Sequence, residues 1–94
     1  MTLANVCVEF GIGIARNSVT HSDWAWFLCE EVGRRAEGPT PDTAVCALLK
    51  ARWGITTRYN ISGWWATRGT KETYFHATEL AAVATLARRL KGAG

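Results

Sequence analysis

The stretch from Tyr59 to His76 constrains the fold most, because apolar and polar residues alternate along it and two tryptophans are adjacent. Neighbouring side chains of a β-strand point to opposite faces of the sheet, so Trp64 and Trp65 cannot both face a core. The Thr-Arg-Gly segment at 67–69 is typical of a three-residue hairpin loop with glycine in the left-handed conformation. We predict two antiparallel strands, with Trp65 on a covered face and Trp64 on an open one.

The length of the loop sets the register of this hairpin. A three-residue loop places Trp64 opposite Glu72 and Ile61 opposite Phe75. A two-residue loop would instead bury the Glu72 carboxylate beside Trp65, and an unpaired charge is costly in a core. We therefore expect the first register, in which Ile61 and Trp65 share the covered face.

Two further elements are predicted in the first half of the chain. In the segment NVCVEFGIGIA the apolar residues recur at every second position over 6–14, which predicts a first strand. A helix is predicted to start near Thr20 or Ser22 and to bury an apolar stripe at spacings of three and four residues. Trp26 lies outside that stripe, so it is either exposed or covered by a second neighbour of the helix.

Capping residues predict two more helices and complete the fold. Thr40-Pro41-Asp42 supplies a capping hydroxyl, a proline at the first helical position and an early acid, so a helix is predicted from there to Gly54. A last helix is predicted from Thr78 to Gly92. The order is then β-α-α-β-β-α. We expect an α+β fold, a two-layer sandwich with a three-stranded, largely antiparallel sheet and the helices on one face.

Length, cysteine use and charge bound the class of protein. A chain of 94 residues predicts a single domain over 1–94. No apolar run reaches the ~20 residues of a membrane span, and the three widely spaced cysteines suit reduced thiols, so we expect a cytoplasmic protein that does not bind membranes. Residues 1–47 carry a net charge of −3 and residues 48–94 carry +6, which favours an acidic partner for the second half.

The sequence holds no pattern that indicates catalysis, a cofactor or a metal ion. Cys29 follows His21 by eight residues but is predicted to lie within a helix, where thiols are usually buried and inert. The histidines and cysteines lack the spacing of a zinc site. The glycines at 11 and 13 lack the third glycine of a nucleotide-binding loop. We expect neither enzymatic activity nor a bound cofactor or metal.

The open face that carries Trp64 is the strongest functional indication. Protein interfaces favour tryptophan, tyrosine and arginine, so we expect a non-enzymatic module that binds another protein. Most of the candidate residues share the face of Trp64, and the others form a second exposed surface on the first helix and the hairpin turn. The candidate partner-binding residues are Trp64, Tyr74, Arg58, His76, Trp26 and Arg68.

Other interpretations use the same face. Single-stranded nucleic acid can stack on aromatic side chains of an open sheet, which makes nucleic-acid binding the runner-up. A homodimer would bury the face against a second copy, and Trp64 would otherwise only shield the sheet. The small size and the arginine- and alanine-rich composition, typical of a GC-rich genome, suggest an accessory protein of a phage or mobile element that acts on a host protein.

Overall fold

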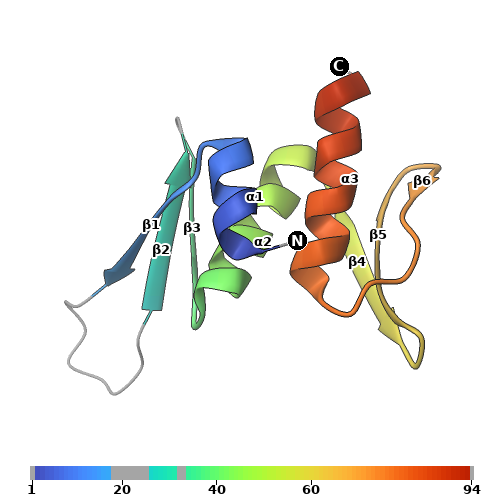
Figure 1. Ribbon diagram of the computed structural model, residues 1–94, viewed down its shortest axis with the longest axis horizontal. Coiled ribbons are helices and arrows are strands. Elements are labelled where there is room, and N and C mark those ends of the chain that lie inside the picture. The colour runs from blue at the N-terminus through green and yellow to red at the C-terminus, as the bar shows by residue number, and fades with distance from the viewer. Residues whose placement is uncertain (1, 18–25, 32–33, 94) are drawn as a thin grey trace. The chain divides into compact units, whose positions relative to one another are not determined.

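The computed structural model describes residues 2–17, 26–31 and 34–93, and its contacts divide the chain into two compact units, Met1–Leu48 and Leu49–Gly94. The elements follow in the order α1 (Leu3–Phe10), β1 (Gly13–Asn17), β2 (Trp26–Glu31), β3 (Arg34–Gly38), α2 (Pro41–Trp53), β4 (Thr56–Asn60), β5 (Gly63–Arg68), β6 (Lys71–Glu72) and α3 (Glu79–Ala93). Each unit holds a three-stranded antiparallel sheet, β1-β2-β3 in the first and β4-β5-β6 in the second (Figure 1).

The chain starts with a helix, so the prediction of a strand over 6–14 is wrong for its first half. The Thr2 hydroxyl accepts a hydrogen bond from the backbone N–H three residues later at 3.2 Å and caps the N-terminus of α1. Gly11 ends the helix in the left-handed conformation, with φ of 66°. Val6 and Phe10, four residues apart, are its buried residues. Two caps and one i, i+4 pair therefore outweigh an apolar alternation that suits a strand equally well.

The predicted first helix is also wrong where it can be compared with the structure. Its expected start at Thr20 or Ser22 lies outside the described residues, but residues 26–31 form β2, and Cys29 therefore lies in a strand. β2 is the central strand of the first sheet, paired antiparallel with β1 on one side and β3 on the other. Ladder hydrogen bonds on both sides stabilise the extended form of a segment whose apolar spacing also suits a helix.

The predicted second helix is confirmed as α2. Thr40 and Thr43 cap its start, because each hydroxyl accepts the other residue's backbone N–H, at 3.2 and 3.1 Å. Gly54 follows its last residue with φ of +64°. The buried residues of α2 are Ala44, Val45, Cys46, Leu48 and Leu49.

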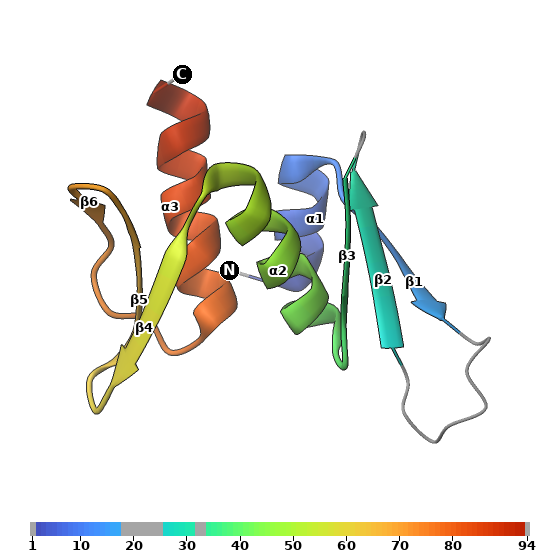
Figure 2. The same ribbon diagram turned by 180° about the vertical axis from the view of Figure 1, so that it is seen from behind.

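The last helix is confirmed as α3, which packs on one face of the second sheet in both views (Figures 1 and 2). The Thr57 hydroxyl of β4 donates to the Glu79 carboxylate at 2.7 Å, and Lys50 lies 3.5 Å from the same carboxylate. Small and branched apolar side chains line the buried side of α3. These residues are Leu80, Ala82, Val83, Ala84, Leu86, Ala87 and Leu90.

The α+β class, with three helices and a three-stranded antiparallel sheet, is confirmed, but the observed order differs from the predicted one. The described residues form two such sheets instead of one. The single domain over 1–94 stays a prediction, beside the two compact units. Within 2–17, 26–31 and 34–93, none of the helices has the length and apolar character needed to cross a membrane. Cytoplasmic location stays a prediction.

Candidate functional site

A tight turn at residues 61–62 decides which face of β5 each tryptophan occupies. Asn60 lies opposite Gly63, so only two residues link β4 to β5. The side-chain oxygen of Asn60 accepts the Ser62 N–H at 2.8 Å, an arrangement that stabilises turns. Gly63 has φ of +125°, which favours glycine. The first strand of the predicted hairpin, expected to run without a break up to the loop at 67–69, is therefore divided between β4 and β5.

This turn reverses the predicted faces of the two tryptophans. Thr57 lies opposite Ala66 and Arg58 lies opposite Trp65. The first pair faces α3, since the Thr57 hydroxyl binds a carboxylate of that helix and Ala66 is fully buried. By alternation Trp64 shares the helix side, while Trp65 lies on the other side with Arg58. The predicted assignment is wrong because a closely packed helix needs the small Ala66 there, and Trp65 has the opposite orientation.

The free edge of β5 pairs with residues 71–76 in two different registers. The register of β6 continues to Thr73, whose N–H donates to the Ala66 carbonyl at 3.0 Å. Further along, His76 and Trp64 exchange two backbone hydrogen bonds of 2.7 and 2.8 Å. The change of register means that the outer segment contains one residue more than β5 between these two points.

The extra residue makes a β-bulge, in which Tyr74 and Phe75 together stand opposite Trp65. Trp64 therefore pairs with His76, whereas Glu72 pairs with Thr67. Neither predicted register of the hairpin is observed. A bulge bends the strand and re-aims its side chains. Tyr74 is 84% exposed and Phe75 is 51% exposed as a result of this bend.

Thr73 holds the bulge to β5 with both its main chain and its side chain. Its hydroxyl accepts the Ala66 N–H at 3.0 Å in a buried position, and Thr73 itself is only 8% exposed. In a regular antiparallel pair that N–H would bind a main-chain carbonyl. The side-chain oxygen takes its place, so the main chain after Thr73 is free to turn outward.

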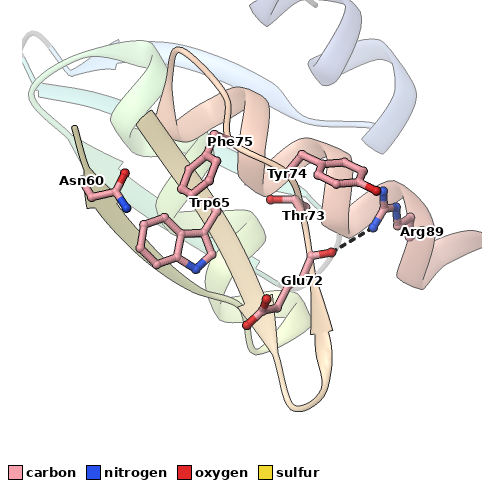
Figure 3. Close-up of a pocket in the computed structure, with 7 residues that line it drawn as sticks. All are labelled: Asn60, Trp65, Glu72, Thr73, Tyr74, Phe75 and Arg89. Atoms are coloured by element: carbon pink, nitrogen blue, oxygen red, sulfur yellow. Dashed lines mark hydrogen bonds between the residues drawn. The ribbon is translucent and has the colours of Figure 1, made fainter. Parts of the chain in front are cut away.

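The bulge borders a pocket of about 630 Å³ within the second unit (Figure 3). The pocket is lined by Asn60, Trp65, Glu72, Thr73, Tyr74, Phe75 and Arg89. The rings of Trp65 and Phe75 meet edge to face, with centroids 5.3 Å apart and planes at 78°. Such pairs are favourable beyond their buried area, so the two rings support each other as one wall.

Arg89 of α3 brings a positive charge to the pocket. One Nη1–H donates to the main-chain carbonyl of Glu72 at 3.0 Å, and Figure 3 shows the Glu72 carboxylate turned away from this contact. A guanidinium carries several N–H donors in a fork that suits carboxylates. Among the described residues only the Glu72 carbonyl binds it, so donors remain for a ligand.

Of the predicted contact residues, Tyr74 lines the pocket and Arg58 lies exposed on the same face of the sheet. Trp64 instead packs against Tyr59 on the other face, with ring centroids 4.9 Å apart. His76 is half-buried and pairs through its main chain with Trp64. The structure thus separates a set that the sequence placed on one face.

The other two predicted contact residues lie away from the pocket lining. Arg68 is exposed at the end of β5, opposite Lys71. Trp26 begins β2 in the first unit, and its side chain is outside the described part of the structure. Partner binding by either residue stays a prediction.

The sequence interpretation missed Trp65, Phe75 and Arg89 as residues of a site. It placed both aromatic rings in the core because it treated the residues before the predicted hairpin loop at 67–69 as one unbroken strand. Asn60 and Gly63, three residues apart, are turn-forming residues and were the available signal for the break. Arg89 had no such signal, because only the packing of α3 brings it to β6.

Burial, and to a smaller extent the nearby Asp42 carboxylate, raises the pKa of the Cys7 thiol, which therefore stays protonated at neutral pH. The described residues contain no group of three or more histidine, cysteine, aspartate or glutamate side chains placed to hold a metal ion.

No protein-family model, curated protein or solved structure matches this chain. The proposed function therefore rests on the geometry of the pocket.

Proposed function

We propose that the chain is a non-enzymatic protein-binding module that receives side chains of a partner protein in the pocket walled by Trp65 and Phe75. The supporting observation is that three large side chains with apolar surface are exposed at or beside this pocket. Tyr74 and Phe75 are 84% and 51% exposed, and Ile61 at the adjacent turn is fully exposed. Exposed clusters of this kind mark interaction surfaces, and aromatic residues dominate binding energy at protein interfaces.

The free energy that a partner can gain on binding depends on the apolar surface that stays exposed in the folded protein. Burying a large apolar side chain contributes roughly 1.5–3 kcal/mol. Phe75 and Tyr74 keep much of that contribution because the bulge turns them outward. A partner that covers both rings gains this free energy of burial on binding, which supports a role for Tyr74 and Phe75 as contact residues.

The lining of the pocket favours binding over covalent chemistry. The Thr73 hydroxyl already accepts a hydrogen bond from the Ala66 N–H, and its neighbours in the pocket are aromatic rings, an amide, a carboxylate and a guanidinium. An activated nucleophile needs a base within hydrogen-bond reach. The composition supports a further part of the proposal, a cytoplasmic accessory protein of a phage or mobile element that acts on a host protein.

Site-specific photo-crosslinking tests the proposal. A benzophenone amino acid replaces Tyr74 in one protein and Val8 in a second, since both side chains are 84% exposed and Val8 lies in α1, outside the pocket. Both proteins are irradiated in lysate of a GC-rich bacterial host, with and without nuclease. We expect a discrete, nuclease-resistant protein adduct from position 74 only, and its loss when Trp65→Ala is added.

The other outcomes separate the competing functions. An adduct that disappears with nuclease would contradict the proposal and favour single-stranded nucleic acid. Equal adducts from both positions would show non-specific contact and would also contradict it. An adduct with the mass of two copies of the chain identifies the partner as a second copy of the protein.

A further inference from the structure

The second unit has a strong excess of positive charge. Residues 49–94 include eight basic and two acidic residues, a net charge of +6. One of the two acids, Glu79, is held by Lys50 at 3.5 Å and by the Thr57 hydroxyl at 2.7 Å. Glu72 is therefore the single acid left to balance the remaining cations of this unit.

Three of these cations lie at or beside the pocket. Arg89 lines it, Arg58 stands opposite Trp65 on the same face, and the exposed Lys71 precedes Glu72 in β6 on the α3 side of the sheet, the side that carries Arg89. In the part of the chain that the structure describes, none of the three forms an ion pair. Exposed cations that no internal acid neutralises attract a partner of opposite charge.

We propose that the pocket binds an acidic peptide segment of a partner protein, in which one aromatic side chain enters the pocket and flanking carboxylates bind Arg89, Arg58 and Lys71. This inference rests on the proposed function and names the chemistry of the partner. The aromatic side chain packs on the wall formed by Trp65 and Phe75. A carboxylate beside it accepts hydrogen bonds from the free donors of Arg89, the pairing for which a guanidinium is best suited.

The main chain of the bulge also suits a peptide. Within the described residues, neither Tyr74 nor Phe75 forms a backbone hydrogen bond. Their N–H and C=O groups lie at the outer edge of the second sheet, where an extended peptide can bind them as an added strand. The contact then combines a side-chain pocket, backbone pairing and ionic contacts.

Two features favour a peptide over single-stranded nucleic acid. Bases bind by stacking on open aromatic faces, but Trp65 and Phe75 are set edge to face at 78°, so they form a corner instead of a platform. The Glu72 carboxylate lines the same pocket. A nucleic acid carries a phosphate at every nucleotide and is repelled there, whereas a peptide can place uncharged groups and N–H donors beside Glu72.

Fluorescence polarisation with matched probes tests the inference. The probes are short labelled peptides with one central tryptophan flanked by glutamates, by serines or by lysines, a glutamate peptide without tryptophan, and a thymidine oligonucleotide of equal length. The proteins are the wild type, Tyr74→Ala, Arg89→Gln and Lys71→Gln. Arg34→Gln is the charge-matched control, since it removes an exposed cation from β3 in the first unit.

We expect the glutamate–tryptophan peptide to bind the wild type about tenfold more tightly than the serine peptide, with no measurable binding of the lysine peptide. Arg89→Gln and Lys71→Gln should each weaken binding by about three- to tenfold, and Arg34→Gln by less than about twofold. Tyr74→Ala should weaken it as well. Within the described residues the Lys71 side chain forms no hydrogen bond or ion pair, so its variant reports binding even if Arg89→Gln loses stability.

Several results would overturn the inference. Equal binding of the glutamate and serine peptides, or equal losses for Lys71→Gln and Arg34→Gln, would remove the acidic requirement while leaving the proposed function intact. Tighter binding of the oligonucleotide than of every peptide would overturn both. Failure of all the peptides to bind, despite a protein adduct from position 74, would overturn the inference alone.

Discussion

At the scale of single residues, the site depends on a few positions where one atom decides the local structure. The Thr73 hydroxyl accepts the buried Ala66 N–H, and Gly63 lets the turn pass close to His76. The sequence signals a turn through Asn60 and Gly63 but shows neither of these two contacts. A threonine in a strand is ordinary, and the Ile-Ser turn beside Gly63 is not one of the common two-residue hairpin sequences.

Thr73→Val should lower the free energy of unfolding by about 1–3 kcal/mol, because it keeps the shape of the side chain but leaves the Ala66 N–H buried without a partner. Thr73→Ser keeps the hydroxyl and should cost less than half as much. Urea denaturation of the two variants measures the difference. Equal losses would mean that the hydroxyl does not hold the bulge.

Gly63→Ala should destabilise the protein by about 2 kcal/mol or more, because its methyl group would lie 2.6 Å from the His76 carbonyl oxygen and φ is +125°. Gly69→Ala is the matched control, since φ is +60° there but nothing lies within 4 Å. It should cost about 1 kcal/mol, the penalty of the left-handed conformation alone. Thermal unfolding separates the two, and a Gly69→Ala loss as large as that of Gly63→Ala would contradict the close approach.

Cys7 should make stability fall at alkaline pH. Folding raises the pKa of its thiol through burial and the Asp42 carboxylate, so the folded state favours the protonated form. The resulting stabilisation is present below the ordinary pKa of a thiol and is lost as the pH rises through the higher pKa of the folded state. Unfolding free energies measured from neutral pH upward should fall more steeply for the wild type than for Cys7→Ala, and parallel curves would contradict the shift.

At the scale of the elements, cap residues were more reliable than apolar periodicity. α2 and α3 are confirmed because Thr40, Pro41, Gly54 and Thr78 each act locally, whereas Gly92, predicted to end the last helix, lies inside α3. The strand predicted over 6–14 failed because a buried pair four residues apart fits the same apolar residues. The prediction of which side chains share a face of the hairpin was wrong because the turn at 61–62 shifts every later side chain to the other side of the sheet. The bulge depends on a contact between β5 and residues 73–76, which no local pattern specifies.

Ala66→Leu tests the assignment of faces. The structure buries Ala66 completely against α3, so the larger side chain should overpack that contact and cost about 1–3 kcal/mol. If the face of Ala66 and Trp64 were the open one, as the sequence suggested, the change would be close to neutral. Arg68→Leu, two residues further on the same strand face but exposed, is the control and should change stability by less than about 0.5 kcal/mol.

At the scale of the whole molecule, alternation and capping residues predicted the α+β class and the positions of the charged residues predicted a positive second half, whereas the site required the three-dimensional arrangement. The positive second half matches the second compact unit closely, because the unit begins at Leu49 and holds all eight basic residues counted there. The division into two units was not expected from the sequence. The proposed contact residues Trp65, Tyr74, Phe75 and Arg89 all belong to the second unit, and so do the cations proposed to bind an acidic partner.

The proposed binding site depends on Trp65 and Phe75 forming the wall of an exposed pocket, and a nuclear Overhauser spectrum of the wild type measures this directly. With selectively labelled tryptophan and phenylalanine, we expect cross-peaks between the ring protons of Trp65 and Phe75, whose centroids are 5.3 Å apart. Cross-peaks from Trp65 to the methyl groups of Val83 or Leu86 in α3 would contradict it. They would place Trp65 beneath the helix and leave the pocket without its wall.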